Sequence, residues 1–157
     1  MDVDGRIRAR KAQGGDLPGI ERLLLASRLP TAGVAEGLSG FLVADDAGRV
    51  VASAGLETYD GAALLRSVAV DPGYRKRGLA AALVRGLLEE CRERGVTEVF
   101  LLTTTAADYF RRLGFTPIPR DDVPRSVQRS REFQDVQCET AQAMLLRLSR
   151  GSEGGRR

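Results

Sequence analysis

The stretch from residue 63 to residue 102 constrains the fold more than any other part of the sequence. An apolar run over Ala63–Val70 ends at Asp71-Pro72-Gly73, a helical repeat follows over Gly78–Arg94, and a second apolar run spans Val96–Leu102. Neighbouring parallel strands need a long crossover connection, which usually contains a helix, whereas a tight hairpin joins antiparallel strands. The helix between these two apolar runs therefore indicates parallel pairing. The sequence therefore predicts a parallel crossover inside a mixed α/β sheet.

The helix of this crossover carries an apolar stripe at four-residue spacing, formed by Leu79, Leu83, Leu87 and Cys91. Residues at this spacing lie on one face of a helix, so we expect the stripe to face the core. Cys91 is then a core thiol rather than a nucleophile. Gly95 follows the stripe at the position where a glycine commonly ends a helix.

Shorter elements are expected on both sides of the crossover. Apolar runs separated by turn signals indicate antiparallel strands in the N-terminal half. Asp16 is expected to cap the first helix. The expected strands cover residues 6–11, 41–44, 50–56, 63–70, 96–102, 115–118 and 141–148, and the expected helices cover 17–27, 34–38, 78–94, 106–113 and part of 121–133.

Length and composition set further bounds. The 157 residues are typical of one domain, expected over residues 6–148 between a flexible leader (1–5) and a disordered basic tail (149–157). The sequence contains no histidine and only two cysteines, Cys91 and Cys138, which excludes histidine-based metal sites and Ser-His-Asp or Cys-His schemes, so no metal is expected. No apolar run approaches the ~20 residues of a membrane span, and no signal peptide is recognisable. We therefore expect a cytoplasmic protein without a membrane partner.

The loop that enters the crossover helix is basic and contains a glycine. Arg75, Lys76 and Arg77 supply positive potential, and Gly78 with the small Ala80 lets an anion approach the backbone at a helix N-terminus. These residues alone indicate an anion site, and an ordinary strand–turn–helix with exposed basic residues is the alternative. Neither a P-loop nor a dinucleotide-binding glycine motif is present.

Two motifs resemble those of the GNAT N-acetyltransferase superfamily. The family's pyrophosphate motif, Arg/Gln-x-x-Gly-x-Gly/Ala, stands here as Arg75-Lys76-Arg77-Gly78-Leu79-Ala80. The second signature stands as Ala106, Phe110 and Leu113-Gly114-Phe115, in the family's order. The resemblance covers roughly residues 6–148 and implies an α/β (α+β) GNAT fold, with a mixed central sheet of about six to seven strands, a splayed parallel pair and about four flanking helices.

The same resemblance implies acetyl-CoA as the co-substrate. Val68 and Val70 would offer backbone groups to the pantetheine arm, and the amides of Arg75–Ala80 would hold the pyrophosphate. The acceptor amine attacks the thioester directly in a ternary complex, so no enzyme nucleophile is needed. The residues expected to bind the donor are Val68, Ala69, Val70, Arg75, Lys76, Arg77, Gly78, Leu79, Ala80, Thr104, Ala106 and Phe110.

A narrower resemblance bears on the acceptor. Residues 101–106, with Phe110 and residues 114–117, are similar to the acetyltransferase domain of N-acetylglutamate synthase. Residues 29–33, 64–68 and 130–133 are similar to small GNAT proteins associated with arsenic-resistance operons. Both imply a small amino-acid-like amine with an acidic end, either glutamate-like or an arsenic or phosphorus analogue.

The catalytic positions depart from the family pattern. Phe110 stands where the family often has a tyrosine that protonates the leaving thiolate, and Leu64 stands where many relatives carry a glutamate base. Tyr109 does not replace the missing tyrosine, because neighbours on a helix point about 100° apart. The remaining catalytic candidates are Glu57, Tyr59 and Thr103, with water as an alternative and a solvated strand-end carboxylate as the alternative for Glu57.

Arg66 interrupts an apolar run, and a buried arginine needs an anionic partner. We expect it to pair with a substrate carboxylate; a structural salt bridge to a residue such as Glu57 is the alternative. The expected substrate-binding residues are Arg66, Ser67, Arg129 and Ser130, the last two on a polar segment that would cover the acceptor site.

Two other function classes were weighed. A non-catalytic acyl-CoA-binding or regulatory module fits the phenylalanine at position 110. A nucleic-acid-binding domain would use the basic residues of 125–131, but these lack the interleaved aromatics on which bases stack, so no nucleic acid is expected. The expected partner is a small-molecule amine or amino acid, with a homodimer as a family-level expectation, and the sequence leaves the acceptor's identity open.

Overall fold

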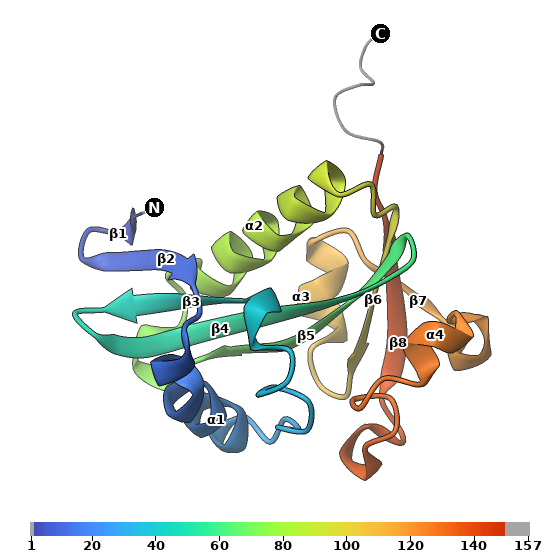
Figure 1. The fold of residues 1–157 in the computed structure, drawn as a ribbon, viewed down its shortest axis with the longest axis horizontal. Coiled ribbons are helices and arrows are strands. Elements are labelled where there is room, and N and C mark those ends of the chain that lie inside the picture. Colours follow the sequence, from blue (N-terminus) through green and yellow to red (C-terminus); the bar gives the residue numbers. More distant parts are fainter. Residues whose placement is uncertain (1, 150–157) are drawn as a thin grey trace, which may run out of the picture. The chain divides into compact units, whose positions relative to one another are not determined.

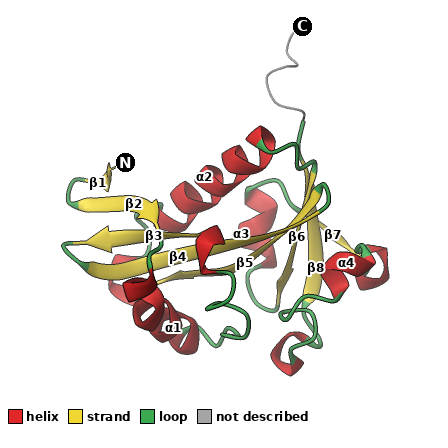
Figure 2. Cartoon of the chain, viewed as in Figure 1, coloured by secondary structure: helices red, strands yellow, loops and turns green. Residues whose placement is uncertain are grey.

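The structure, a computed structural model, describes residues 2–149 and has the mixed α/β organisation expected from the sequence (Figure 1). Its strands are β1 Asp2–Asp4, β2 Ile7–Lys11, β3 Phe41–Asp46, β4 Arg49–Tyr59, β5 Ala62–Val70, β6 Glu98–Thr103, β7 Thr116–Ile118 and β8 Gln142–Arg147. Its α-helices, drawn in red in Figure 2, are α1 Leu17–Ala26, α2 Leu79–Glu93, α3 Ala107–Arg112 and α4 Arg125–Gln128.

These elements pack into two compact units. The first holds the residues up to Leu56 together with Arg66–Leu87, and the second holds Glu57–Leu65 together with the residues from Leu88 onward. The hydrogen-bonded strand order is β1-β2-β3-β4-β5 in the first unit and β5-β6-β8-β7 in the second, so β5 contributes to both. β5 and β6 run in parallel, which confirms the predicted crossover, whereas β6 and β8 are antiparallel.

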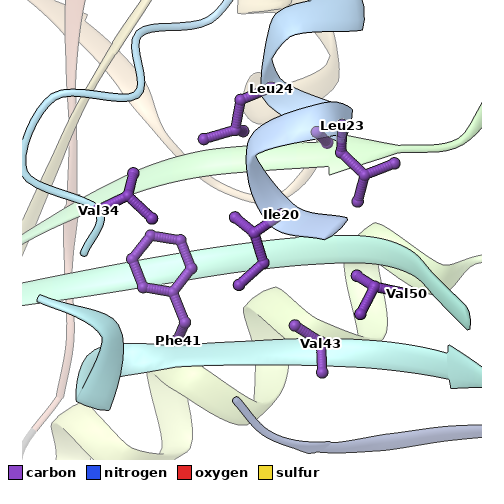
Figure 3. Close-up of a cluster of buried hydrophobic side chains, with 8 residues drawn as sticks. Ile20, Leu23, Leu24, Val34, Phe41, Val43 and Val50 are labelled. Atoms are coloured by element: carbon purple, nitrogen blue, oxygen red, sulfur yellow. The ribbon is translucent and has the colours of Figure 1, made fainter. Parts of the chain in front are cut away.

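In the first unit, α1 and α2 cover opposite faces of β3. Val43 packs in a buried cluster with Ile20 and Leu23 of α1 (Figure 3). Its neighbour Leu42 reaches the other helix, since its Cδ1 lies 3.1 Å from where a Cβ on Gly86 of α2 would stand. Because successive side chains of a strand point to opposite faces, the two helices must lie on either side of the strand.

The second unit has a core of its own. All four residues of the predicted stripe of α2 are buried, and the last of them, Cys91, belongs to this unit. Burial raises the pKa of the Cys91 thiol to about 11, which agrees with a core thiol rather than a nucleophile. The main cluster joins the strands to the segment that precedes β8, and its buried members are Ala62, Leu64, Phe100, Val123, Val127, Phe133, Ala143 and Leu145.

Two local expectations near the N-terminus differ from the structure. The backbone of Asp2–Asp4 forms β1, which pairs with β2 where a flexible leader was expected. Residues 34–38 form turns rather than an α-helix, followed by a 3-10 turn over Leu38–Gly40. Glycines at positions 33, 37 and 40 disfavour helix propagation there, and Val34 is instead buried in the α1 cluster.

Asp16 stands at the N-cap of α1, but it does not cap that helix with its side chain. Its carboxylate accepts hydrogen bonds from the backbone N–H of Gln13 (2.7 Å) and from both terminal nitrogens of Arg10 (2.8 and 3.0 Å). Two features disfavour a cap: Pro18, the second residue of the helix, has no N–H to donate, and the backbone of Asp16 is itself helical (φ −84°, ψ −13°) rather than extended. The expected basic tail lies, from residue 150 onward, outside the described residues. Between residues 2 and 149, no helix is long and apolar enough to cross a membrane.

Candidate functional site

β5 departs from regular strand geometry at Ser67. This residue has φ +59°, in the left-handed region that non-glycine residues seldom adopt, and such a residue inside a strand marks a bulge. The hydroxyl of Ser53 donates a 2.8 Å hydrogen bond to the Ser67 carbonyl, and Nε of Arg66 donates to the Ser67 Oγ at 2.9 Å. The kink is therefore held through both the backbone and the side chain of Ser67.

Arg66 is an internal residue of the first unit, with 2% of its surface exposed. Its Nη2 donates a hydrogen bond to the carbonyl oxygen of Pro30 (3.2 Å), so the guanidinium links β5 to the loop after α1. Sequence reasoning correctly identified a buried arginine, and the structure gives it protein partners. Its role toward a substrate carboxylate, like that of the buried Ser67, stays a prediction.

Beyond the bulge, β5 regains an alternating pattern. Ala69 is buried and packs in the α1 cluster, whereas Val68 and Val70 are half-buried. The parallel ladder pairs Ala62–Leu64, at the start of β5, with Glu98–Phe100, at the start of β6. Val68 and Val70, whose backbone groups are predicted to bind the donor, thus lie after the part of β5 that pairs with β6.

A short 3-10 turn, Pro72–Tyr74, connects β5 to the basic loop. Asp71 begins the turn: one carboxylate oxygen accepts from the Gly73 N–H (3.0 Å) and the other from Arg49 (3.1 Å). The Gly73 amide, reinforced by Arg49 and then Arg22, lowers the pKa of Asp71. The carboxylate therefore stays charged and anchors the turn.

The basic loop is exposed over residues 75–78, which are Arg75, Lys76, Arg77 and Gly78. Leu79 is buried in the core and has only backbone to offer a ligand. Lys76 has φ +66° and Gly78 has φ +76°, so the chain turns sharply twice before the helix. The first helical bond runs from Ala82 N–H to the Gly78 carbonyl (3.0 Å). The amides just after Gly78 have no partner within the helix, as at any helix N-terminus, and this arrangement suits an anion.

Two of the catalytic candidates lie together in the second unit. The hydroxyl of Tyr59 donates a 2.6 Å hydrogen bond to Oε1 of Glu57. Both side chains are half-buried on β4, and their two-residue spacing places them on one face of the strand. The third candidate, Thr103, accepts a hydrogen bond from the Ala106 N–H (3.0 Å), so its hydroxyl shapes the turn that begins α3.

The second family signature forms part of the core. Phe110 is 7% exposed and meets Phe115 edge-to-face at 5.9 Å between ring centroids. Thr104 is exposed and Ala106 is half-buried. Any role of these residues in donor binding stays a prediction.

Residues 119–141 form a closed excursion between β7 and β8, and Arg120 ties its two ends. Its Nη1 donates to the carbonyls of Cys138 (2.8 Å) and Ala141 (3.0 Å), and its guanidinium carbon lies 5.1 Å from the centre of the Phe133 ring. The segment is thus internally cross-linked, where sequence reasoning expected only a polar, partly helical stretch.

The two substrate candidates in this excursion have different surroundings. Ser130 is buried, and its Oγ accepts from the Phe133 N–H (3.2 Å) in a local turn. Arg129 is exposed and contributes to a hollow of about 430 Å³. The residues that line this hollow are Asp121, Val123, Arg125, Gln128, Arg129 and Gln134. Arg129 therefore has access to a ligand, whereas Ser130 serves the turn.

Sequence reasoning missed Tyr74, Asp46 and Ser53, which support the loop and the bulge. No motif marks them, because their roles come from contacts between residues 14 to 28 positions apart. Among residues 2–149, no three histidine, cysteine, aspartate or glutamate side chains cluster in a way that could hold a metal ion.

Comparison with known proteins adds independent findings. The sequence profile of the acetyltransferase (GNAT) family matches residues 18–115. An amino-acid acetyltransferase of Enterobacter sp. (strain 638) is 33% identical over 67 residues, which cover 43% of this chain and 15% of that protein. The uncharacterized N-acetyltransferase CT2212 of Chlorobaculum tepidum is 32% identical over 97 residues, covering 61% of this chain and 62% of that protein.

Solved structures show the same likeness. N-acetylglutamate synthase from Neisseria gonorrhoeae, complexed with coenzyme A and N-acetyl-glutamate, has a TM-score of 0.79 at 21% identity, over 92% of this chain and 35% of that one; this likeness concerns the fold alone. Rv2747 from Mycobacterium tuberculosis, in complex with CoA and NLQ, has a TM-score of 0.77 at 28% identity, over 90% of this chain and 99% of that one.

Proposed function

The chain belongs to the acetyltransferase (GNAT) family, and from this premise we propose that it transfers the acetyl group of acetyl-CoA to the amine of a small amino-acid-like acceptor. The relatives support the acceptor class, since several of them are amino-acid acetyltransferases. Because the match covers only a small part of those proteins, their whole activity reaches this chain as a proposal.

The observation that carries the proposal is the exposed loop 75–80. Its residues Lys76 and Gly78 adopt left-handed conformations just before α2, and a Cβ at Gly78 would meet no atom within 4 Å, so the space beside it is open. Backbone amides, a helix N-terminus and basic side chains together favour a pyrophosphate. The loop thus fits the diphosphate of acetyl-CoA, and the half-buried Val68 and Val70 would offer backbone to its pantetheine arm.

The reaction needs few enzyme groups. The acceptor nitrogen forms a bond to the acetyl carbon while the carbon–sulfur bond breaks, the amine loses a proton and the leaving thiolate takes one up. In our proposal the Glu57 carboxylate, oriented by Tyr59, accepts the amine proton, directly or through water. The Phe110 side chain has no ionisable proton, so in this proposal the leaving thiolate is protonated by water or by Thr103.

The hollow around Arg129 is our proposed site for the acidic end of the acceptor. Arg125 and Arg129 line it, and arginine binds carboxylates with paired N–H donors. Val123 lines the same hollow and belongs to the buried cluster against which the Tyr59 ring packs. The proposed base pair and the proposed acceptor site therefore border the same hydrophobic cluster of the second unit. An arsenic or phosphorus analogue of glutamate would present a similar anion. A cytoplasmic location and a homodimer stay predictions.

A direct assay tests the proposal. Purified protein is incubated with acetyl-CoA and a panel of amino acids, glutamate and its arsenic and phosphorus analogues, and thiol release is followed. We expect turnover with at least one acidic amino acid, and Arg129→Ala should raise the acceptor KM about tenfold or more, while the exposed Arg147→Ala leaves it unchanged. Tight CoA binding without turnover on any acceptor would favour the non-catalytic acyl-CoA-binding module instead.

A further inference from the structure

The 3-10 turn Pro72–Tyr74, which directly precedes loop 75–80, is held by hydrogen bonds at both of its ends. Asp71, at its start, accepts hydrogen bonds from Arg49 of β4 (3.1 Å) and Arg22 of α1 (3.5 Å). Tyr74, at its end, donates a 2.5 Å hydrogen bond to Oδ2 of Asp46, the last residue of β3. The turn is thus attached to three elements of the first unit.

The Asp46 carboxylate is an unusual partner, because its side chain is only 9% exposed. Arg6 lies 3.8 Å from the same oxygen that receives the Tyr74 hydroxyl. Hydrogen bonding to Asp46 raises the pKa of Tyr74, so the hydroxyl remains a donor across the neutral range. The bond to a charged acceptor is of the stronger kind.

Tyr74 also reaches forward into the loop. The guanidinium carbon of Arg77 lies 5.0 Å from the centre of the Tyr74 ring, within the range of a cation–π contact. One side chain therefore connects the end of β3 to the middle of the basic loop. Between these points Lys76 holds a left-handed conformation, which is unfavourable for a residue with a side chain and persists only where the surroundings enforce it.

We propose that Tyr74 and Asp46 are positioning residues for the donor: their hydrogen bond holds loop 75–80 in the conformation that gathers its amides around the pyrophosphate. The inference rests on the proposed function and adds two residues that no motif marks. Because Arg75–Gly78 are exposed, the loop gains little from packing of its own side chains. Its shape depends instead on the docked turn that precedes it.

The experiment measures CoA binding by calorimetry, which requires no knowledge of the acceptor. Tyr74→Phe removes only the hydroxyl and keeps the ring beneath Arg77, and Asp46→Asn weakens the same bond from the other side. We expect each variant to raise the Kd for CoA by about three- to tenfold, which is part of the energy of one charge-assisted hydrogen bond, because the other contacts of the turn remain. The double variant should bind no more weakly than the weaker single one, because both changes remove one interaction.

Two controls separate positioning from general damage. Tyr109→Phe, a tyrosine of the second unit, should leave the CoA Kd within twofold of the wild type. S-acetylpantetheine, which lacks the pyrophosphate, should bind wild type and Tyr74→Phe with equal affinity in the same measurement, whereas a merely structural role would weaken the binding of both ligands. Equal CoA affinity in wild type and Tyr74→Phe, or additive effects in the double variant, would overturn the inference. Failure of the wild type to bind CoA would instead refute the proposed function on which it rests.

Discussion

The Tyr59 hydroxyl and the Glu57 carboxylate meet at 2.6 Å on one face of β4. The two residues were separate candidates for the base, and the structure makes them a pair in which the tyrosine orients the carboxylate. A carboxylate held in this way loses rotational freedom before any substrate arrives. Preorganised groups of this kind contribute to catalysis when they face the reacting proton.

Replacing the Glu57 carboxylate by an amide tests the proposed role of this pair as the base. Glu57→Gln still accepts the Tyr59 hydrogen bond through its amide oxygen but cannot take a proton, so we expect kcat to fall by about 10²-fold, with the acetyl-CoA KM unchanged. Steady-state kinetics check this, with the exposed Glu89→Gln on α2 as the matched control. A kcat within threefold of the wild type would leave water as the base.

The donor loop is expected to depend more on its backbone than on its charges. Gly78→Val places a β-branched residue at φ +76°, which distorts the amides of the loop, so the acetyl-CoA KM should rise about tenfold or more. Lys76→Ala removes an exposed charge and should raise it only about two- to threefold. The opposite ranking would show that side-chain charge, not amide geometry, holds the pyrophosphate.

Arg66 is expected to matter for stability as well as for any substrate. Arg66→Ala leaves the Pro30 carbonyl and the Ser67 hydroxyl without their donor in a buried place, which should lower the free energy of unfolding by about 2–4 kcal/mol. Urea denaturation measures this loss, and Arg147→Ala on the surface should change it by less than about 0.5 kcal/mol. In a folded Arg66→Lys variant, a larger rise in the acceptor KM than in the acetyl-CoA KM would support the substrate role. Equal rises would exclude it.

The ion pair of Arg10 with Asp16 should make stability fall in acid. Hydrogen bonds from Arg10 lower the pKa of Asp16 in the folded state, so the pair contributes fully above the unfolded value of about 4. The contribution is lost as the pH falls from there through the lower folded pKa. Unfolding free energies at pH 7, 4 and 3 should therefore decrease less steeply in Asp16→Asn. Asp108→Asn, at a carboxylate that is 88% exposed, should retain the wild-type slope.

The parts of the fold that sequence predicted well are those governed by local rules. The α2 stripe and its terminal Gly95 follow from helix periodicity and from the left-handed conformation that glycine adopts, here φ +77°. The parallel pairing of β5 with β6 follows from the helix between them. The basic loop before α2 was also predicted, because its glycine, its charges and the following helix are contiguous, and its role toward a pyrophosphate stays a prediction.

What sequence did not predict depends on distant contacts. The bulge at Ser67 exists because Ser53 and Arg66 hold it, and no propensity places a serine at φ +59°. Asp16 is a residue type that commonly caps helices, yet its carboxylate binds Arg10 and Pro18 has no N–H to offer it. Tyr74 directly precedes loop 75–80, but its hydrogen bond to Asp46, 28 residues away, cannot be predicted from the sequence. Such residues are found by tracing hydrogen bonds in three dimensions.

The closed excursion between β7 and β8 has a consequence for how acceptor choice can change. Ile118 and Ala143 pair directly across the two strands, so the chain leaves the sheet and re-enters it at adjacent positions, and Arg120 fastens the two ends. A segment with such neighbouring ends can be exchanged without shifting strand register, provided that the replacement keeps the core side chains at positions 123, 127 and 133. In the proposed function the donor is bound by loop 75–80 and the acceptor by residues 119–141, and on that proposal the two preferences can diversify independently.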